Sequence, residues 1–271
     1  MGLYISNQWS SHLMEITNDL LIVGLERSVK FSHRSLNSDR FIIGPQHKSL
    51  TAELLKTILT GLKFPAEHIS DALSWFTKSN QIGLGFEQKN GVSSYRLYFE
   101  FFDRYRPDPV MNCGMLHLGY KWCCSDPSDM FVTRYSYVPN FNGNNPGQVV
   151  RSMINTLNTI FVDEVVSLTE RALAGIPPNK RIMTCAAEKS GCRNSFDVNV
   201  YSSKNRVNFV KDELRRIIDF FKIDRRELDA FLDKSGGAAL GHISCGMDAM
   251  NNPFFTIYFD DFTPVINQSR K

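Results

Sequence analysis

Five pairs of alternating segments recur along this 271-residue chain, and segments with helical periodicity lie between most of them. In each alternating segment apolar residues occupy every second position, which is typical of a β-strand. A turn or a loop joins the two segments of each pair, so each pair predicts a β-hairpin. The clearest pair is 81–102, whose strands meet at Asn90-Gly91. The other pairs are 20–30 with 39–43, 115–122 with 131–138, 181–188 with 195–201, and 241–248 with 254–260.

Helices are expected at 49–62, 66–78, about 145–174, 206–222 and 225–234, from apolar residues at helical spacing. Ten antiparallel strands in an open sheet would expose two edges and leave one face uncovered. Closure into a barrel removes both edges, and the helices then cover the outer apolar face. We therefore expect an α/β fold built from α+β repeats, in which a ten-stranded antiparallel β-barrel with a solvated lumen is surrounded by helices. Residues 1–271 are expected to form this single domain.

The second face of hairpin 81–102 is unusual, because Gly83 and Gly85 lie opposite Arg96 and Tyr98. Glycine weakens a strand unless something must approach it closely, so this face is interpreted as cleared space on the lumen side. The same face of the other hairpins carries further polar and aromatic residues. The candidates are Glu26, Arg40, His117, Lys121, Tyr135, Asn199, Tyr201, His242, Ser244, Thr256 and Tyr258.

Composition excludes several classes of protein. A net charge of +3 without a basic stripe argues against a nucleic-acid partner. No apolar segment is long enough to span a membrane and no secretory leader is visible, so a cytoplasmic protein with no membrane partner is expected. The six cysteines form no C-x-x-C pair and have no histidine at zinc spacing, which favours reduced thiols and no metal site made by the protein alone.

Three segments resemble the cyanobactin prenyltransferases, a family of ABBA or PT-barrel aromatic prenyltransferases. Residues 25–30 with 39–41 resemble the family's L-E-x-S-x-K and S-R-F segments, and residues 93–98 resemble its S-S-L-K-M-H strand. The last hairpin, with Gly246 and Asn251-Asn252-Pro253, resembles the family's final hairpin. The segments keep the family's order and similar separations. The resemblance implies transfer of an isoprenyl group from its diphosphate to a side chain of a ribosomally made cyclic or linear peptide.

The resemblance also implies roles for single residues. Glu26 would be the general base, while Arg40 and Arg96 would bind the diphosphate, with Arg96 in place of the family's lysine. Tyr98, in place of a histidine, would lie beside them with Tyr201 and Tyr258. Mg²⁺ would be the cofactor, bound through the diphosphate. The substrate pocket would comprise Ser244, His242, Thr256, Asn199, Tyr135 and His117, where the small Ser244 leaves room for a geranyl as well as a dimethylallyl donor.

Prenyl transfer requires these residue types for chemical reasons that do not depend on the resemblance. A leaving diphosphate needs fixed cations, an allylic cation is stabilised by aromatic faces, and a carboxylate can take the acceptor's proton. A plain ion pair between Glu26 and Arg40 is the alternative for those two residues. Two other functions remain open: a prenyltransferase for a small aromatic or amino-acid substrate, and a barrel that binds isoprenoids without turnover. The acceptor residue (Tyr, Trp, Ser/Thr, His or Arg) is not selected by the sequence.

Overall fold

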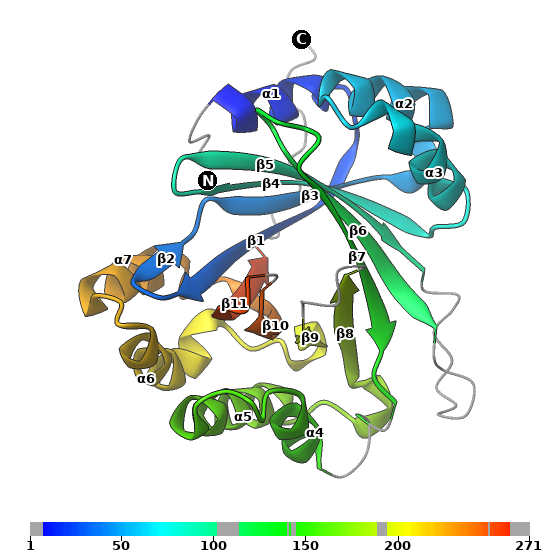
Figure 1. Ribbon diagram of the computed structural model, residues 1–271. Helices are drawn as coiled ribbons and strands as arrows, with labels where there is room; N and C mark the ends of the chain where they lie inside the picture. The colour runs from blue at the N-terminus through cyan, green and yellow to red at the C-terminus, as the bar shows by residue number, and fades with distance from the viewer. Residues whose placement is uncertain are drawn as a thin grey trace.

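The computed structural model describes residues 8–101, 114–139, 141, 145–188, 194–248 and 250–260. Figure 1 shows a ring of strands with helices on its outside. The strands are β1 (Ile22–Ser32), β2 (Ser35–Asn37), β3 (Arg40–Pro45), β4 (Gln81–Lys89), β5 (Val92–Glu100), β6 (Met115–Cys123), β7 (Met130–Tyr137), β8 (Ile182–Glu188), β9 (Asn194–Asn199), β10 (Ala239–Met247) and β11 (Pro253–Asp260). The α-helices are α1 (Gln8–Ile16), α2 (Ala52–Gly61), α3 (Ala66–Phe76), α4 (Pro146–Met153), α5 (Thr159–Leu173), α6 (Lys211–Phe221) and α7 (Arg225–Ser235).

The sheet closes on itself, which confirms the predicted barrel. Its strands follow the order β11-β10-β9-β8-β7-β6-β5-β4-β3-β1, all pairs are antiparallel, and β11 pairs with β1 to complete the ring. Within the described residues, the short β2 pairs only with β1, beside Lys30 and Phe31, and is an eleventh strand outside the ten-stranded ring. Closure leaves each long strand with one neighbour on either side.

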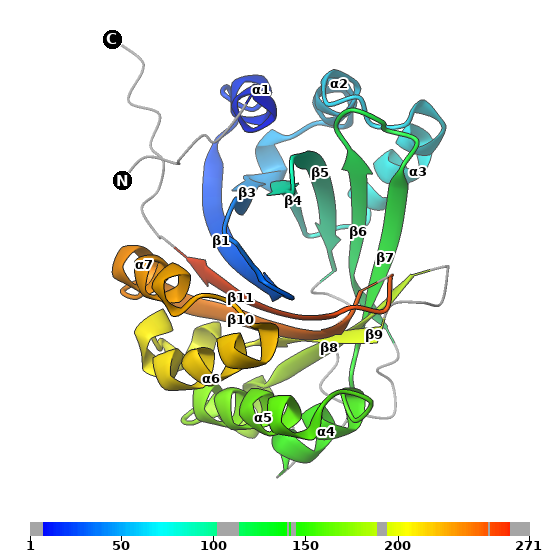
Figure 2. The ribbon, with the colours of Figure 1, turned by 60° about the vertical axis from the view of Figure 1, so that its left-hand side comes forward.

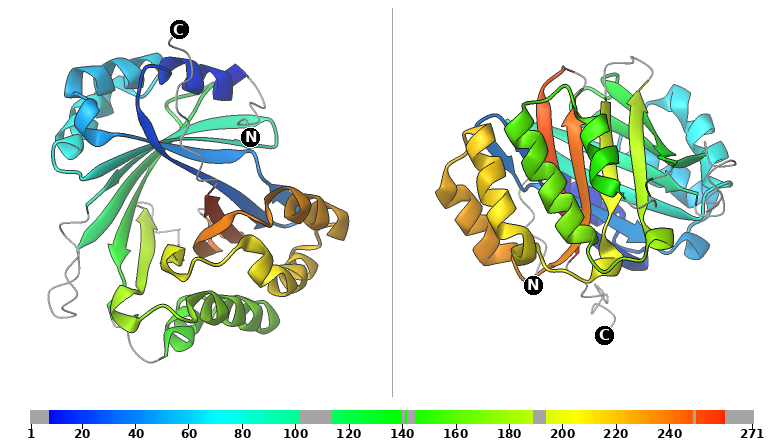
Figure 3. Two further views of the ribbon diagram at one scale, coloured as in Figure 1. Left: turned by 180° about the vertical axis from the view of Figure 1, so that it is seen from behind. Right: turned by 90° about the horizontal axis from the view of Figure 1, so that it is seen from below.

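Two hydrophobic cores lie between the barrel and its helices. Figure 2 shows α1, α2 and α3 on one side of the barrel, and Figure 3 shows α4 to α7 packed side by side across β8 to β11. One core joins α1, α2 and α3 to outward residues of β3 to β6, among them Leu84, Leu97 and Trp122. The other joins α4 to α7 to β1 and β8 to β11 through Phe31, Phe255 and their neighbours. In the described part of the chain, no helix is both long and apolar enough to cross a membrane.

Several boundaries differ from the sequence expectations. The continuous helix expected over 145–174 is wrong in its middle, because a turn separates α4 from α5 and the Asn158 side chain caps the start of α5 by accepting from the Ile160 and Phe161 N–H groups. Neither α1 nor the three-residue β2 was expected. Strand β9 ends at Asn199, and Tyr201 begins a 3₁₀ turn (Tyr201–Ser203). The predicted turn around Gly191 and the 103–112 connection lie outside the described residues.

The interpretation of Gly83 and Gly85 as cleared lumen space is wrong. A Cβ added at Gly83 would lie 2.9 Å from Cγ2 of Ile42, and one at Gly85 would lie 3.1 Å from Cγ1 of the same side chain. A Cβ at Gly119 would meet the ring of Tyr98 at 2.9 Å. These glycines therefore make room for neighbouring side chains of the barrel wall.

Replacing Phe255 by alanine should destabilise the protein by about 3–5 kcal/mol, since it empties a buried site at the β1–β11 seam. Phe255 is fully buried and its ring centroid lies 5.6 Å from that of Phe31, its register partner. The free energy of unfolding in urea measures the effect. Phe131→Ala, at a strand position that is 42% exposed, is the control and should cost much less. Equal losses for the two variants would contradict this account of the seam.

Candidate active site

The lumen is polarised from one end to the other. Lys30 and Glu26 face it from β1, and Arg96 and Glu100 face it from β5, in each case four residues or about 13 Å apart. Because β1 and β5 run in opposite directions, Lys30 and Arg96 share one end while Glu26 and Glu100 share the other. We call these the cationic end and the acidic end of the lumen.

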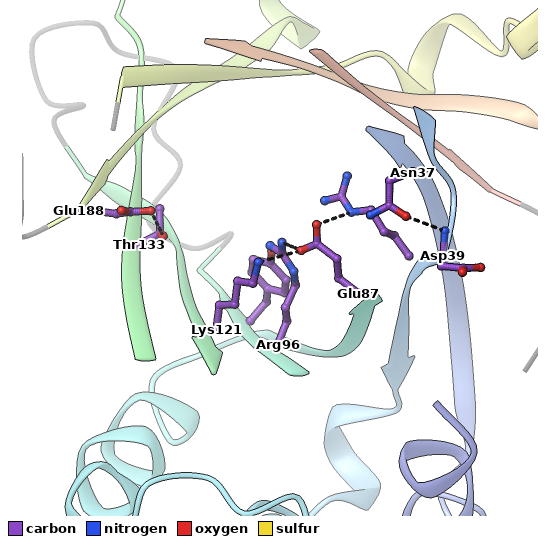
Figure 4. A network of polar contacts seen from close by, with 9 residues as sticks. Asn37, Asp39, Glu87, Arg96, Lys121, Thr133 and Glu188 are labelled. Atoms are coloured by element: carbon purple, nitrogen blue, oxygen red, sulfur yellow. Dashed lines mark hydrogen bonds and ion pairs between the residues drawn. The ribbon is translucent and has the colours of Figure 1, made fainter. Parts of the chain in front are cut away.

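A buried carboxylate organises the cationic end. Glu87, on β4, has a side chain that is only 3% exposed. Its Oε1 lies 3.3 Å from Nε of Arg40, and its Oε2 contacts both Nη2 of Arg96 and Nζ of Lys121, the latter at 3.0 Å. Figure 4 shows Glu87 between Asn37 on one side and Arg96 and Lys121 on the other. Strands β3, β4, β5 and β6 are consecutive neighbours, so the sheet itself brings these charges together.

The charges at this end shift one another's protonation. Burial alone would raise the pKa of Glu87, but Arg96, Arg40, Lys121 and Lys30 outweigh it and hold that pKa well below its usual range. Burial lowers the pKa of Lys30 to about 7, against the opposing influence of Glu87, and burial also lowers the pKa of Lys121. Glu87 is therefore ionised at neutral pH, while Lys30 titrates near it.

Some donors at the cationic end have no acceptor. Nη1 of Arg40, a residue only 7% exposed, and Nδ2 of Asn37 are buried without a hydrogen-bond partner among the described residues. The Asn37 amide is oriented by its Oδ1, which accepts from the Asp39 N–H at 3.2 Å. Buried donors are rarely left unpaired, so these two point to an anionic or oxygen-rich ligand.

The acidic end holds a chain of hydrogen bonds around Glu26. The Tyr201 hydroxyl donates to Oε2 of Glu26 at 2.5 Å. Nε2 of His242 lies 4.0 Å from the same oxygen, and Nδ1 of His242 donates to Oδ1 of Asp197 at 2.6 Å. A Cβ at Gly241 would lie 2.4 Å from Cζ of Tyr201, so a glycine is needed there for the ring to reach Glu26.

Protonation at this end is tuned by burial and by neighbouring charge. Burial raises the pKa of Glu26, opposed by His242 and by the Tyr201 hydrogen bond. Burial disfavours the charged His242, but Asp197, Glu26 and Glu100 prevail and raise its pKa to about 9. Burial also raises the pKa of Glu100. At neutral pH this end therefore carries one imidazolium among three carboxyl groups, two of which have raised pKa values.

Aromatic rings lie between the two ends. Arg96 donates through Nη1 to the Tyr98 hydroxyl at 2.8 Å, and the ring of Tyr98 lies 6.4 Å from that of Tyr135. Tyr135 also meets His117 edge to face at 6.1 Å. Tyr258 lies 5.9 Å from the His242 ring, and burial raises its pKa against the opposing charge of Arg40. Tyr258 therefore contacts His242 of the acidic end and lies close enough to Arg40 of the cationic end for that charge to affect its pKa.

The structure brings together most of the residues that the sequence singled out. Arg40 and Arg96 share Glu87, so the alternative in which Glu26 pairs with Arg40 is wrong. Tyr201, expected beside the diphosphate, instead donates its hydroxyl to Glu26. The remaining pocket candidates lie on β9, β10 and β11 close to His242 in register: Asn199, Ser244 and Thr256.

Five residues at the two ends were missing from the predicted site. They are Lys30, Asn37, Glu87, Glu100 and Asp197. Four of them have the same alternation as the predicted residues, and this parity was the available signal. Asn37 could not be found this way, because a three-residue strand has too few positions to show alternation.

Comparison with known proteins shows the fold. No protein-family model matches the chain, and no curated protein matches it in sequence. Among solved structures, PriB in its binary complex with product diphosphate is similar at a TM-score of 0.62 and 12% identity, over 93% of this chain and 88% of that one. 5-Dimethylallyl tryptophan synthase from Streptomyces coelicolor, in complex with DMASPP and Trp, matches at a TM-score of 0.61 and 12% identity, over 99% and 92%. NotF in complex with brevianamide F and DMSPP matches at 0.55 and 11%, over 88% and 79%. The chain therefore has the same barrel fold as these proteins.

Asp197→Asn should lower the pKa of His242 from about 9 toward or below its ordinary value near 6.5, because the closest anion is lost and burial then dominates. Titration of the His242 ring protons by NMR measures this. Asp71→Asn is the control, since Asp71 accepts a hydrogen bond from Tyr120 outside the lumen.

The same change should alter how stability depends on pH. A raised histidine pKa stabilises the fold fully below about pH 6.5, and this contribution is lost as the pH rises through about 9. The unfolding free energy of the variant should accordingly change less between those two pH values. An unshifted His242 titration in Asp197→Asn would contradict the assigned pairing.

Proposed function

We propose that this chain, which has the prenyltransferase barrel, is an enzyme that transfers an isoprenyl group from its diphosphate to a nucleophilic side chain. One observation carries the proposal: a cationic cluster with unpaired buried donors faces a general-base candidate within one lumen. The binding of diphosphate-containing molecules by PriB and of DMASPP by the Streptomyces enzyme supports it.

The donor's diphosphate would bind at the cationic end. Nη1 of Arg40 and Nδ2 of Asn37 would donate hydrogen bonds to its oxygens, and Lys30, Lys121 and Arg96 supply further positive charge. Guanidinium groups suit phosphate oxygens because they offer parallel N–H donors. The hydroxyls of Tyr98 and Tyr258 lie within reach of the same charges. This end would stabilise the diphosphate as it leaves.

The prenyl group would lie along the aromatic residues toward the acidic end. Breaking the C1–O bond sends its electron pair to the diphosphate and leaves an allylic cation, which the faces of Tyr98, Tyr135 and Tyr258 would stabilise. The barrel wall limits the water that could trap this cation. Ser244 is small and only 5% exposed, and we propose that it leaves room for a geranyl chain.

Glu26 would take the acceptor's proton as the acceptor atom bonds to C1. Its raised pKa makes it a better base than an exposed carboxylate, and the Tyr201 hydrogen bond fixes its orientation. The charged His242, held by Asp197, lowers the pKa of Glu26 against burial and so favours the ionised form that can take the proton. Tyr201, His242 and Asp197 therefore position Glu26 and adjust its pKa.

Mg²⁺ remains a proposal. Bound to the diphosphate, the ion would add positive charge to the leaving group. Among the described residues, no group of three His, Cys, Asp or Glu is arranged to hold a metal, and both oxygens of Glu87 already contact cations. An ion would therefore be held by phosphate oxygens, and no step above depends on it.

We propose a cyclic or linear peptide as the acceptor, from the resemblance to the cyanobactin enzymes. The second candidate is a small aromatic or amino-acid acceptor, because the structural neighbours are described with tryptophan and brevianamide F. The charge of the acidic end favours acceptors that donate N–H groups or carry positive charge, such as guanidine or imidazole. Glu26, Glu100 and Asp197 face one imidazolium there, so such an acceptor would be better paired than a phenol.

Glu26→Gln should reduce prenyl transfer by about 10²–10⁴-fold, because it removes the general base but keeps a group of the same shape. The loss should appear in kcat, with the KM for the donor nearly unchanged, since Glu26 lies at the acidic end. Mass spectrometry of the acceptor measures the rate. Glu188→Gln is the matched control: this carboxylate, on β8, accepts a hydrogen bond from Thr133. Full activity in Glu26→Gln would contradict the assignment of Glu26 as the base. Absence of prenyl transfer by the wild type with every acceptor, while the donor still binds, would favour a barrel that binds isoprenoids without turnover.

A panel of acceptors discriminates the candidates. Dimethylallyl and geranyl diphosphate should each be tested with free tryptophan, free arginine, and cyclic peptides that differ in a single Arg, His, Tyr or Trp. We expect a prenyl mass gain on a cyclic peptide, larger for Arg or His than for Tyr, with geranyl accepted. Product only with the free amino acids would support the second candidate and overturn the peptide assignment.

A further inference from the structure

Glu87 places a fixed negative charge among the cations that would bind the donor. We infer that Glu87 is an internal counter-anion that weakens diphosphate binding and so lets the product diphosphate leave. The inference rests on the proposed function, because it concerns the same donor site. Glu87 would then set the affinity for the diphosphate and the rate of its release, whereas the cations would bind it.

The converging cations need such an anion. Arg40 is the register partner of Glu87, and Arg96 is the register partner of Lys121, so cations on three strands converge on one small region of wall. Buried like charges repel strongly in a medium of low polarity. Glu87 contacts Arg40, Arg96 and Lys121 at once and is almost wholly shielded from solvent, which makes it the counter-ion of the cluster.

The same charge opposes a bound diphosphate. Arg40 Nη1 and Asn37 Nδ2 stay unpaired while Glu87 is in place, so a diphosphate can bind beside Glu87 without displacing it. The two anions would then share the same cations within one buried region and repel each other. The positive charge of Lys30 and Lys121 depends on this balance, because Glu87 raises the pKa of both lysines against burial.

A purely orienting role for Glu87 predicts the opposite sign. If Glu87 served only to hold Arg96 and Lys121 in position, its loss would weaken diphosphate binding. Glutamine keeps a carbonyl oxygen that accepts from Arg96 but carries no charge, so Glu87→Gln separates charge from orientation. The direction of the change in affinity therefore decides between the two roles.

The experiment titrates inorganic pyrophosphate into the full chain by calorimetry at pH 6.5, below the pKa of about 7 for Lys30. Glu87→Gln should bind pyrophosphate at least about tenfold more tightly than the wild type, because the repulsion from Glu87 is gone and the bound pyrophosphate takes its place as the anion that keeps Lys30 and Lys121 charged. In turnover the variant should show a lower KM for the donor, a lower kcat and stronger inhibition by pyrophosphate. Glu213→Gln is the control: Glu213 is also buried and ion-paired, to Arg171 at 3.0 Å, but lies on α6 in the helical layer.

The outcomes are distinguishable. Unchanged or weaker binding in Glu87→Gln, with the wild type binding and Arg40→Ala not binding, overturns this inference and leaves the proposed function standing. Absence of binding in the wild type overturns the donor site itself. If Glu87→Gln does not fold, Lys121→Gln with and without Glu87→Gln gives the same comparison at a lower net charge. The double variant should then bind more tightly than Lys121→Gln alone.

Discussion

The constraint on which this structure depends is that charge placed inside a closed barrel must be paired inside it. Ten strands that turn their apolar faces toward two helical cores leave the other face of each strand to the lumen. Charged residues at these inward positions cannot reach bulk water freely, so their neighbours around the ring must balance them. The ion pairs of Glu87 with Arg40, Arg96 and Lys121 meet this requirement at one end. The bonds from His242 to Asp197 and from Tyr201 to Glu26 meet it at the other.

The two ends divide the proposed chemistry between them. Strand direction decides the division, because residues four apart on antiparallel strands fall at matching heights and collect like charges at each end. The cations that would bind the leaving diphosphate and the base that would take the proton are thereby about 13 Å apart along the strands. Tyr98, Tyr135 and Tyr258 occupy the space between them, where a cation would form and react. The separation also keeps Glu26 from forming an ion pair with Arg40. Such a pair would make Glu26 a weaker base and occupy the donors of Arg40.

The sequence predicted the barrel and much of its lumen because alternation decides which face each residue occupies. Arg40, Arg96 and Tyr98 were placed correctly on that basis, as were Glu26 and His242. The sequence could not show which residues meet across strands. Glu87 acquires its importance only when β3 and β5 flank β4, and Asn37 lies on a strand too short to show a pattern. Tyr201 was expected on a strand, but the strand ends before it and Gly241 admits its ring. The prediction of open lumen space at Gly83 and Gly85 is wrong because the side chain of Ile42, on the neighbouring strand, fills the space beside them.

The proposed division of the lumen requires that the cationic end bind the donor's diphosphate and that the acidic end receive its prenyl carbon. A crystal structure with a non-hydrolysable thiolodiphosphate analogue of the dimethylallyl donor tests it most directly. The account predicts phosphate oxygens within hydrogen-bond distance of Arg40 Nη1 and Asn37 Nδ2, with C1 of the prenyl group directed past Tyr98 toward Glu26. A diphosphate bound outside the lumen, or bound at the acidic end beside His242, would contradict it.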